Sequence, residues 1–229
     1  MNDTSSTKIT MNDKPLKQVT SIKFLGIILN DKLTWENHKK LVHTKISKTI
    51  GLLYKCNKFM NDNNCIDMYK TFIEPYFLYA IEAWGHSIQS ENDPLIKLQS
   101  KILRILFNCY RTADAWKHSN GQIKDIRDLY STVIRKLCMK HQFEALPKKF
   151  SVNIMPEMNI NQLENKVTRI SLSDMYDYKK CQNLDRTHFK SSCIKTWNEL
   201  SMDLKVLPYS SGKEYLHKAL KTIKNFKKI

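Results

Sequence analysis

Residues 23–38 read KFLGIILNDKLTWENH, and this stretch decides what the rest of the chain can be. A short apolar run stands here directly before a segment that is rich in lysine. Gly26 follows Phe24 and Leu25, and two adjacent apolar residues break the alternation that a regular half-buried strand shows. A glycine at such a point indicates a bulge or a close approach by another backbone. The stretch therefore predicts a strand that leads into a helix.

The β pattern is confined to residues 8–29. Apolar and polar residues alternate at its start, and Asn12-Asp13-Lys14-Pro15 supplies a turn. The chain has only five glycines and six prolines in 229 residues, which is typical of long helices joined by short connections. We therefore expect a mainly α protein with a short N-terminal β-hairpin.

A helix with one lysine-rich face follows the strand. Thr34 is its predicted N-cap, and apolar residues recur at helical spacing from Leu41 to Leu53, so that the helix runs to about Phe59. Its polar positions carry no carboxylate after Glu36. Lysines on an exposed face are ordinarily balanced by acids four residues away, because like charges at that spacing repel. The unbalanced face favours an anionic partner, and the candidate contacts are Lys39, Lys40, Lys45, Lys48 and Lys55.

Most of the remaining chain is predicted to be helical. Helical periodicity begins at Ile66, is interrupted by Pro75, and returns over about 93–106 and 122–147. Tyrosine, phenylalanine and tryptophan are frequent near Pro75, and we interpret these rings as core residues in preference to a base-stacking surface. The C-terminal residues form a basic amphipathic pattern after a polar, aperiodic stretch. The predicted divisions are 1–33, 34–147, an irregular linker over 148–186, and a basic helical segment over 187–229.

The charge of the chain indicates a polyanionic partner. Lysine and arginine number 38 against 22 acidic residues, which gives a net charge of +16. A fold does not require such an excess, and the self-repulsion makes sense when the usual partner is nucleic acid. An anionic membrane surface is the alternative, although no apolar run is long enough to cross a bilayer. We therefore expect RNA or DNA as partner, and no membrane.

The cysteines and the N-terminus predict an intracellular protein, cytoplasmic or nuclear. The six cysteines show no paired spacing and mostly stand in apolar, periodic stretches, as reduced thiols do. Residues 1–4 begin a polar stretch that lacks the apolar core of a secretory signal.

The sequence offers no catalytic or metal-binding constellation. Two-metal polymerase or nuclease chemistry needs clustered carboxylates, and no two acidic residues are adjacent anywhere in the chain. His188 and Cys193 have the spacing of half a zinc knuckle, but no Cys-x-x-Cys pair precedes them. A phosphate-binding glycine loop and a nucleophile elbow are also missing. We therefore name no catalytic residue, no metal ligand and no cofactor for this chain.

Five short motifs, in the same order and with similar spacing, resemble the reverse transcriptases of jockey-like non-LTR retrotransposons. That family has an aromatic-Leu-Gly triplet after the palm, and a Leu, Trp and His that enter the first thumb helix. A Tyr-Pro-Tyr-Trp pattern, a Gln-x-Lys and a Trp-Asn-x-Leu motif follow. The residues that match are Phe24-Leu25-Gly26; Leu33, Trp35 and His38; Tyr69, Pro75, Tyr79 and Trp84; Gln99 and Lys101; and Trp197-Asn198-Glu199-Leu200. The departures are Ala80, where the family often has glycine, and Ser201, where proline is usual.

The resemblance implies that residues 1–33 are the end of a palm and residues 34–147 a helical thumb, with a basic C-terminal piece. Phe24, Leu25 and Gly26 would form a primer-grip-like strand near the primer terminus, and the five lysines would face phosphates. The implied thumb-packing residues are Trp35, His38, Tyr79 and Trp84, of which Trp35 and His38 would fix the start of the helix against the palm.

The family's paired aspartates and their Mg²⁺ are expected upstream of Met1, on the palm and fingers of the same polyprotein. The resemblance thus implies a C-terminal piece of an RNA-directed DNA polymerase that binds primer–template duplex and does no chemistry alone. The alternatives are a non-catalytic helical protein-interaction module and a decayed retroelement product without function.

Overall fold

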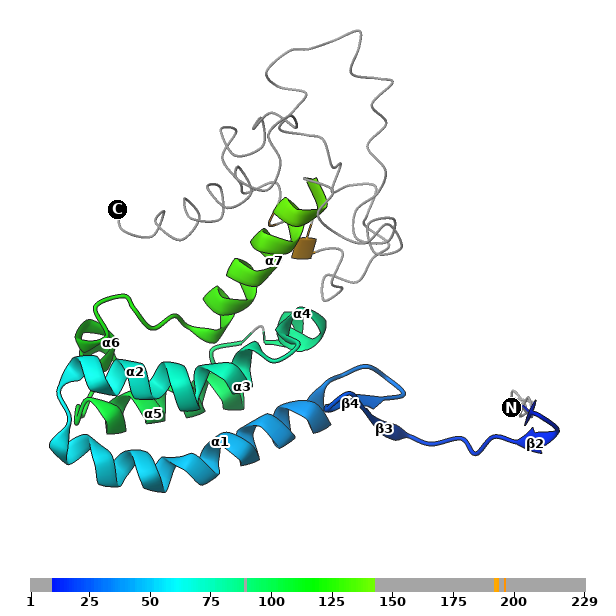
Figure 1. Ribbon diagram of the computed structural model, residues 1–229, viewed down its shortest axis with the longest axis horizontal. Coiled ribbons are helices and arrows are strands. Elements are labelled where there is room, and N and C mark those ends of the chain that lie inside the picture. The colour runs from blue at the N-terminus through cyan, green and yellow to red at the C-terminus, as the bar shows by residue number, and fades with distance from the viewer. Residues whose placement is uncertain (1–9, 89, 143–191, 194–195, 197–229) are drawn as a thin grey trace, which may run out of the picture.

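The computed structural model describes residues 10–88, 90–142, 192–193 and 196. Two small β-hairpins precede a bundle of helices, so the prediction of a mainly α protein with short N-terminal strands is confirmed (Figure 1). The strands are β1 Thr10–Met11, β2 Lys14–Pro15, β3 Ser21–Phe24 and β4 Ile27–Asn30. The helices are α1 Glu36–Cys56, α2 Asp62–Phe72, α3 Glu74–Leu78, α4 Ile81–Trp84, α5 Pro94–Leu106, α6 Thr112–His118 and α7 Ile126–Gln142, with 3-10 turns at Asn57–Phe59 and Gly85–Ser87.

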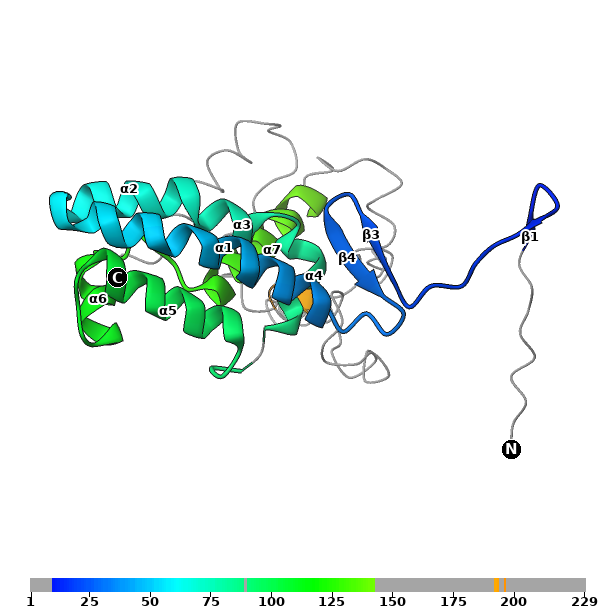
Figure 2. The same cartoon turned by 90° about the horizontal axis from the view of Figure 1, so that it is seen from below.

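The two hairpins differ in their relation to the bundle. Strands β1 and β2 pair with each other, and both views show them far from the helices (Figures 1 and 2). Strands β3 and β4 pair over four residues each, from Ser21 opposite Asn30 to Phe24 opposite Ile27, and β4 packs against α1. The second hairpin is therefore the one that the bundle positions.

Gly26 does not lie in a β-bulge, which was one of the two interpretations that the sequence left open. Leu25 and Gly26 are the two central residues of the turn that joins β3 to β4, with φ of 44° and 81°. Two successive positive φ values are those of the two-residue turn whose twist matches antiparallel strands, and glycine adopts them without steric cost. The apolar pair that broke the alternation in the sequence therefore marks the end of a strand.

Helix α1 begins one residue later than the sequence suggested. Its N-cap is Trp35, at φ 64°, and not Thr34. The side chain of Thr34 is already engaged, because Asn30 Nδ2 donates to its Oγ1 at 2.8 Å while Thr34 N donates to Asn30 Oδ1 at 3.0 Å. These two hydrogen bonds close the connection after β4. Trp35, which is only 7% exposed, is therefore the N-cap of the helix.

Helices α1, α2, α3 and α5 form the core. They lie side by side in both views, with α1 in closest association with α5 (Figures 1 and 2). Pro75 interrupts the second predicted helix as expected, since α2 ends at Phe72 and α3 starts with Pro75 in its first turn. The largest fully buried side chains come from all of these elements, and burial of each contributes about 1.5–3 kcal/mol; they include Ile46, Leu53, Tyr69, Phe77, Trp84 and Ile102.

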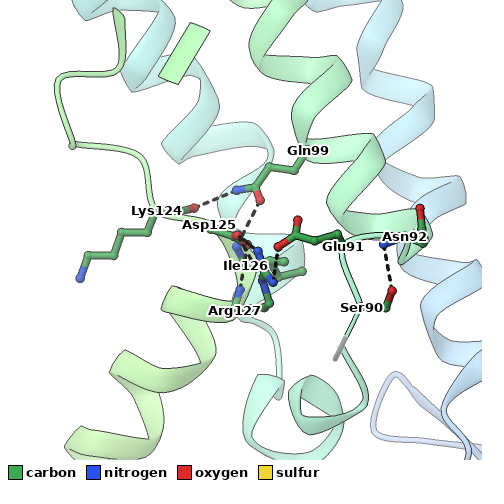
Figure 3. Close-up of polar contacts among 8 residues, drawn as sticks. All are labelled: Ser90, Glu91, Asn92, Gln99, Lys124, Asp125, Ile126 and Arg127. Carbon is green, nitrogen blue, oxygen red and sulfur yellow. Dashed lines mark hydrogen bonds and ion pairs between the residues drawn. The ribbon is translucent and has the colours of Figure 1, made fainter. Parts of the chain in front are cut away.

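The buried amide of Gln99 joins three helical elements. Its Nε2 donates to Tyr69 Oη of α2 at 2.7 Å. The same nitrogen donates to the carbonyl of Lys124 at 2.8 Å, and Oε1 accepts from the amide of Ile126 at 3.1 Å (Figure 3). Burial raises the pKa of the Tyr69 phenol, which stays neutral. Both N–H groups of the amide and one lone pair of its carbonyl oxygen are thus used, and α5 is fixed to α2 and to the start of α7.

The fourth predicted helix starts at Ile126 and not at Gln122. Asp125 Oδ1 accepts from the backbone amide of Arg127 at 3.1 Å, a capping contact that begins α7 at this point. The Arg127 guanidinium in turn contacts Asp125 at 2.8 Å and Glu91 at 2.6 Å (Figure 3). The preceding residues 122–125 are not helical, and the carbonyl of Lys124 among them accepts from Gln99.

Gly85 allows α7 to approach the 3-10 turn after α4. A Cβ at this position would lie 2.4 Å from Cδ2 of Tyr130, which is closer than carbon atoms can approach. The tyrosine ring of α7 therefore packs directly on the glycine backbone.

Two predicted segments lie outside the described residues, namely the irregular linker over 148–186 and the basic C-terminal helix from 211 onward. From the predicted helix near Cys193, only residues 192, 193 and 196 are described, and they are helical. In the described part of the chain, no helix combines the length and the apolar character needed to cross a bilayer.

We predict that the Gln99→Leu substitution lowers the free energy of unfolding by about 3–5 kcal/mol, because it leaves three buried polar groups without partners at about 1–3 kcal/mol each. Urea denaturation followed by circular dichroism measures this value. The control is Lys101→Gln, an exposed change on the same helix, with an expected effect within about 0.5 kcal/mol. A loss below about 1 kcal/mol for Gln99→Leu would contradict the role given to this amide.

Candidate nucleic-acid interface

The turn of the β3–β4 hairpin presents two large apolar side chains to solvent. Phe24 is 58% exposed and Leu25 is 74% exposed, whereas Ile27 and Leu29 of β4 pack against the core. The hairpin is thus anchored by one strand and leaves its tip uncovered. Phe24 and Leu25 belong to the triplet that the sequence singled out as primer-grip-like, and the structure places them at a solvent-facing edge.

Tyr79 holds the hairpin turn against the bundle. Its hydroxyl donates to the carbonyl of Leu25 at 2.5 Å, across 54 residues of sequence. A Cβ on Gly26 would lie 3.2 Å from the same hydroxyl and 3.3 Å from a ring carbon, so the glycine allows the ring to approach the turn. Gly26 therefore serves both the positive φ of the turn and its contact with Tyr79.

His38 anchors the second strand of the hairpin. Its Nδ1 accepts from the backbone amide of Ile28 at 3.4 Å, so the proton of the neutral ring is on Nε2. The imidazole meets the Trp84 indole edge to face, with ring centroids 5.3 Å apart. Burial, and to a lesser extent the charge of Lys45, lower the pKa of His38 below its ordinary value. The ring is therefore neutral when the hairpin is docked.

Trp84 completes this set of contacts. Its Nε1 donates to the carbonyl of Tyr79 at 2.9 Å, and its side chain is fully buried. Trp35 meets His86 edge to face at 6.2 Å. The structure thus brings His38, Tyr79 and Trp84 together beside the hairpin, and these are three of the four residues that the sequence named as packing residues.

A cavity of about 370 Å³ opens beneath the hairpin turn. Gly26 lies on one side of it and His38 and Lys45 of α1 on another, and Tyr76 and Tyr79 complete its wall. Both tyrosines are exposed, at 37% and 54%. The cavity offers aromatic faces and one ammonium group directly next to the exposed tip of the hairpin.

Four of the five predicted lysines are exposed along α1: Lys40, Lys45, Lys48 and Lys55. Among the described residues, none of them forms an ion pair with a carboxylate. The helix starts beside the hairpin and ends near α6 at the opposite end of the bundle (Figures 1 and 2). Its exposed lysines are therefore spread along the length of α1, from the hairpin toward the other end of the bundle.

The structure corrects the prediction for Lys39. Its ammonium group lies 3.1 Å from Asp93 Oδ2, and the two side chains are only 12% and 5% exposed. Asp93 also accepts from the backbone amide of Leu95 at 2.9 Å and so caps α5. Lys39 is thus committed to an ion pair between α1 and α5, and is not available to a phosphate. Pairing across 54 residues leaves no signal in the periodicity of a single helix.

Sequence reasoning missed two further lysines, Lys97 and Lys101 of α5. Both are exposed and line a groove between α5 and α1. Their spacing of four residues was visible in the sequence, but only the packing of α5 against α1 places them in a groove that residues of both helices line.

The described residues hold no site for the Mg²⁺ of a polymerase. In this part of the chain, no group of three or more His, Cys, Asp or Glu side chains is close enough to hold a metal ion. The described arrangement presents exposed ammonium groups and exposed apolar side chains, and no reaction step is assigned to it.

The sequence of this chain is similar to those of retrotransposon polymerases. Over 100 residues, or 42% of the chain, it is 34% identical to an RNA-directed DNA polymerase from the mobile element jockey of Drosophila funebris. Over 105 residues it is 26% identical to a probable RNA-directed DNA polymerase from transposon X-element of Drosophila melanogaster, and over 101 residues 27% identical to the jockey polymerase of that species. The chain spans only 11–12% of the length of these relatives. The predicted resemblance to jockey-like reverse transcriptases is therefore confirmed. No protein-family model matches the chain, and no solved structure does.

Ala80 stands at a position that favours glycine, and this yields a test of the packing around Tyr79 and Trp84. Its φ is 50° and its ψ is 32°, in the left-handed region that costs an L-residue about 1–2 kcal/mol. We expect Ala80→Gly to raise the free energy of unfolding by about 0.5–1 kcal/mol after the added chain entropy of glycine is subtracted. The control, Ala113→Gly, changes an exposed residue of regular helix α6 and should lower stability by about 0.5–1 kcal/mol. Urea titrations of both variants check the opposite signs, and a destabilised Ala80→Gly variant would contradict the assignment.

His38 makes hairpin docking sensitive to pH. The pKa of His38 is lowered in the folded protein, so acidification through the ordinary value of 6.5 protonates the unfolded chain first. The stability that His38 contributes is therefore fully present above that value and is lost as the pH falls toward the lowered, folded-state pKa. We expect the difference in unfolding free energy between wild type and His38→Gln to shrink between pH 7.5 and pH 5, as urea denaturation at each pH measures.

Hydrogen exchange at the Ile28 amide gives a local measure of the protonation of His38. Protonation of Nδ1 removes the acceptor for this amide, so its protection should fall on acidification in wild type and stay flat in His38→Gln. A difference in stability that is independent of pH would contradict the neutral, buried state of His38.

Proposed function

We propose that this chain is the part of a jockey-like reverse transcriptase that holds the primer–template duplex. In this proposal Lys40, Lys45, Lys48 and Lys55 of α1 contact phosphates without reading sequence, as positioning contacts do. The hairpin tip with Phe24, Leu25 and Gly26 lies near the primer end. The bundle then acts as a thumb that keeps the duplex against a palm.

One observation carries the proposal: the exposed lysines of α1 have no carboxylate partner in the described part of the chain, and they start beside the hairpin. Lysines that serve only solubility gain from acidic neighbours at helical spacing. Lys45, Lys48 and Lys55 have none within α1, and Glu36, four residues before Lys40, pairs with Lys39. The net charge of +16 supports the same partner, because a polyanion offsets the self-repulsion. The similarity to RNA-directed DNA polymerases supplies the class of nucleic acid.

The catalytic part of such an enzyme would be supplied by a palm and fingers of the same polyprotein. Those domains would carry the aspartates and the Mg²⁺, for which the described residues have no cluster. We propose that this chain binds duplex in the cell interior and does not polymerise by itself. An RNA–DNA hybrid is the natural probe, because extension of a DNA primer on an RNA template produces one.

Replacing Lys40, Lys45, Lys48 and Lys55 together with glutamine tests the proposal. Each phosphate contact that is lost reduces the slope of log affinity against log salt by about 0.9, so we expect a decrease of about three to four units. Fluorescence anisotropy with a labelled RNA–DNA hybrid, measured over a range of salt concentrations, gives the slope. Glutamine keeps the helix propensity, and circular dichroism checks that the fold is retained.

The matched control replaces four other exposed lysines, Lys14, Lys17, Lys70 and Lys117, and so removes the same charge. For this control we expect the slope of log affinity against log salt to stay within about one unit of the wild-type value, a change that the general loss of charge accounts for. Equal losses in both variants would show binding to be non-specific attraction. Affinity insensitive to salt in the wild type would favour the protein-interaction module.

A further inference from the structure

A groove of about 530 Å³ runs between α1 and α5, on a different side of α1 from the cavity beneath the hairpin. His43, Ser47 and Gly51 line it from α1, and Lys97 and Lys101 line it from α5. The two helices lie side by side in both views (Figures 1 and 2). The mechanism proposed above uses none of these five residues.

We infer that this groove binds the sugar–phosphate backbone of one nucleic-acid strand, and the inference rests on the function proposed above. It goes beyond that function because it assigns a second row of cations, on α5, and a floor between the two rows. The duplex would then be held by two helices and not by the lysine face of α1 alone.

Lys97 and Lys101 of α5 line the groove, and lysines of α1 adjoin Gly51, which lines it from the other helix. Lys97 and Lys101 are one helical turn apart and exposed, and no carboxylate among the described residues pairs with either. On α1, Lys48 and Lys55 are the neighbours of Gly51 on the helix surface, three residues before it and four after it. Gly51 therefore lies between cations on both sides. Lys97 and Lys101, four residues apart, repel each other, so the groove favours a ligand that bears several negative charges over a neutral or singly charged one.

The space beside Gly51 is empty, and the packing of the fold does not require a glycine at this position. It stands in the interior of α1, is exposed, and a Cβ built on it meets no atom within 4 Å. Glycine in a helix interior is less stable than alanine, and alanine would fit here. A local choice that lowers stability without a packing reason points to a functional requirement. The missing side chain lets a strand approach the α1 backbone between the two rows of lysine.

The polar groups of the floor suit phosphate oxygens. Ser47 Oγ and His43 Nδ1 both line the groove and lie 3.4 Å apart, so that the hydrogen-bonded pair leaves one of its two donors, the hydroxyl or a ring N–H, for a ligand. Donors on the floor and ammonium groups at the rim provide contacts to consecutive phosphates of one strand. A folded protein partner would need complementary acids at each of these points, so we commit to the phosphodiester backbone.

The experiment separates binding from folding at Gly51. Gly51→Ala should raise the melting temperature because alanine is the better helix former and meets no clash. Gly51→Gln keeps a neutral helix former but fills the floor, and we expect its affinity for the RNA–DNA hybrid to fall about tenfold with the melting temperature at or above that of wild type. Ala113→Gln on exposed α6 is the control, with unchanged affinity.

A second variant tests the cations independently. Lys97→Gln with Lys101→Gln should reduce the salt slope by about two units, whereas the same change at Lys70 and Lys117 should not. Anionic vesicles of phosphatidylserine serve as the competing polyanion, and the groove variants should bind them as wild type does.

Each outcome decides the matter. If Gly51→Gln and the Lys97/Lys101 pair bind the hybrid like wild type while the four-lysine variant of α1 loses affinity, the groove inference is overturned and the proposed function stands. If none of the three variants changes the salt slope, both are overturned. A Gly51→Gln variant that loses affinity for hybrid and vesicles equally would show a general polyanion surface, and would also overturn the inference.

Discussion

The buried side-chain amide of Gln99 is the contact on which the arrangement of the helices depends. Three hydrogen bonds from one amide link α5 to Tyr69 of α2 and to the two residues that lead into α7. A buried amide is stable only when its donors and acceptor are paired, so the three elements can pack in this one relation and in few others. The position of α5 in turn decides where Asp93, Lys97 and Lys101 lie relative to α1.

The hairpin is held to this frame by side chains from three elements. Tyr79 binds the carbonyl of Leu25, His38 accepts from Ile28, and Trp84 supports both through the Tyr79 carbonyl and the His38 ring. Because the tip with Phe24 remains exposed while the base is fixed, the hairpin presents apolar side chains at a defined place. A rigid placement of this kind lets the hairpin and the lysine face of α1 act on one ligand.

Local rules predicted several elements well. The spacing of apolar residues indicated α1, α2 and α5, and the interruption at Pro75 followed from the geometry of proline. The same rules misplaced the starts of two helices. Thr34 does not cap α1 because it is hydrogen-bonded to Asn30, and Asp125 caps α7 at a later residue than predicted. These rules also left the interpretation of Gly26 open, since a turn glycine and a bulge glycine have the same sequence context. Side-chain hydrogen bonds made these differences, and periodicity does not encode them.

The sequence by itself determined that the chain is basic and mainly helical, that one helix carries lysines with no acid after Glu36, and that its motifs resemble those of jockey-like polymerases. Only the tertiary structure decided which of these lysines reach solvent. Lys39 and Lys40 are adjacent and identical in type, yet one is paired with Asp93 and the other is exposed. The physical reason is that burial and ion pairing depend on how α1 and α5 dock. That contact joins residues 54 positions apart, and no pattern within a single helix specifies it.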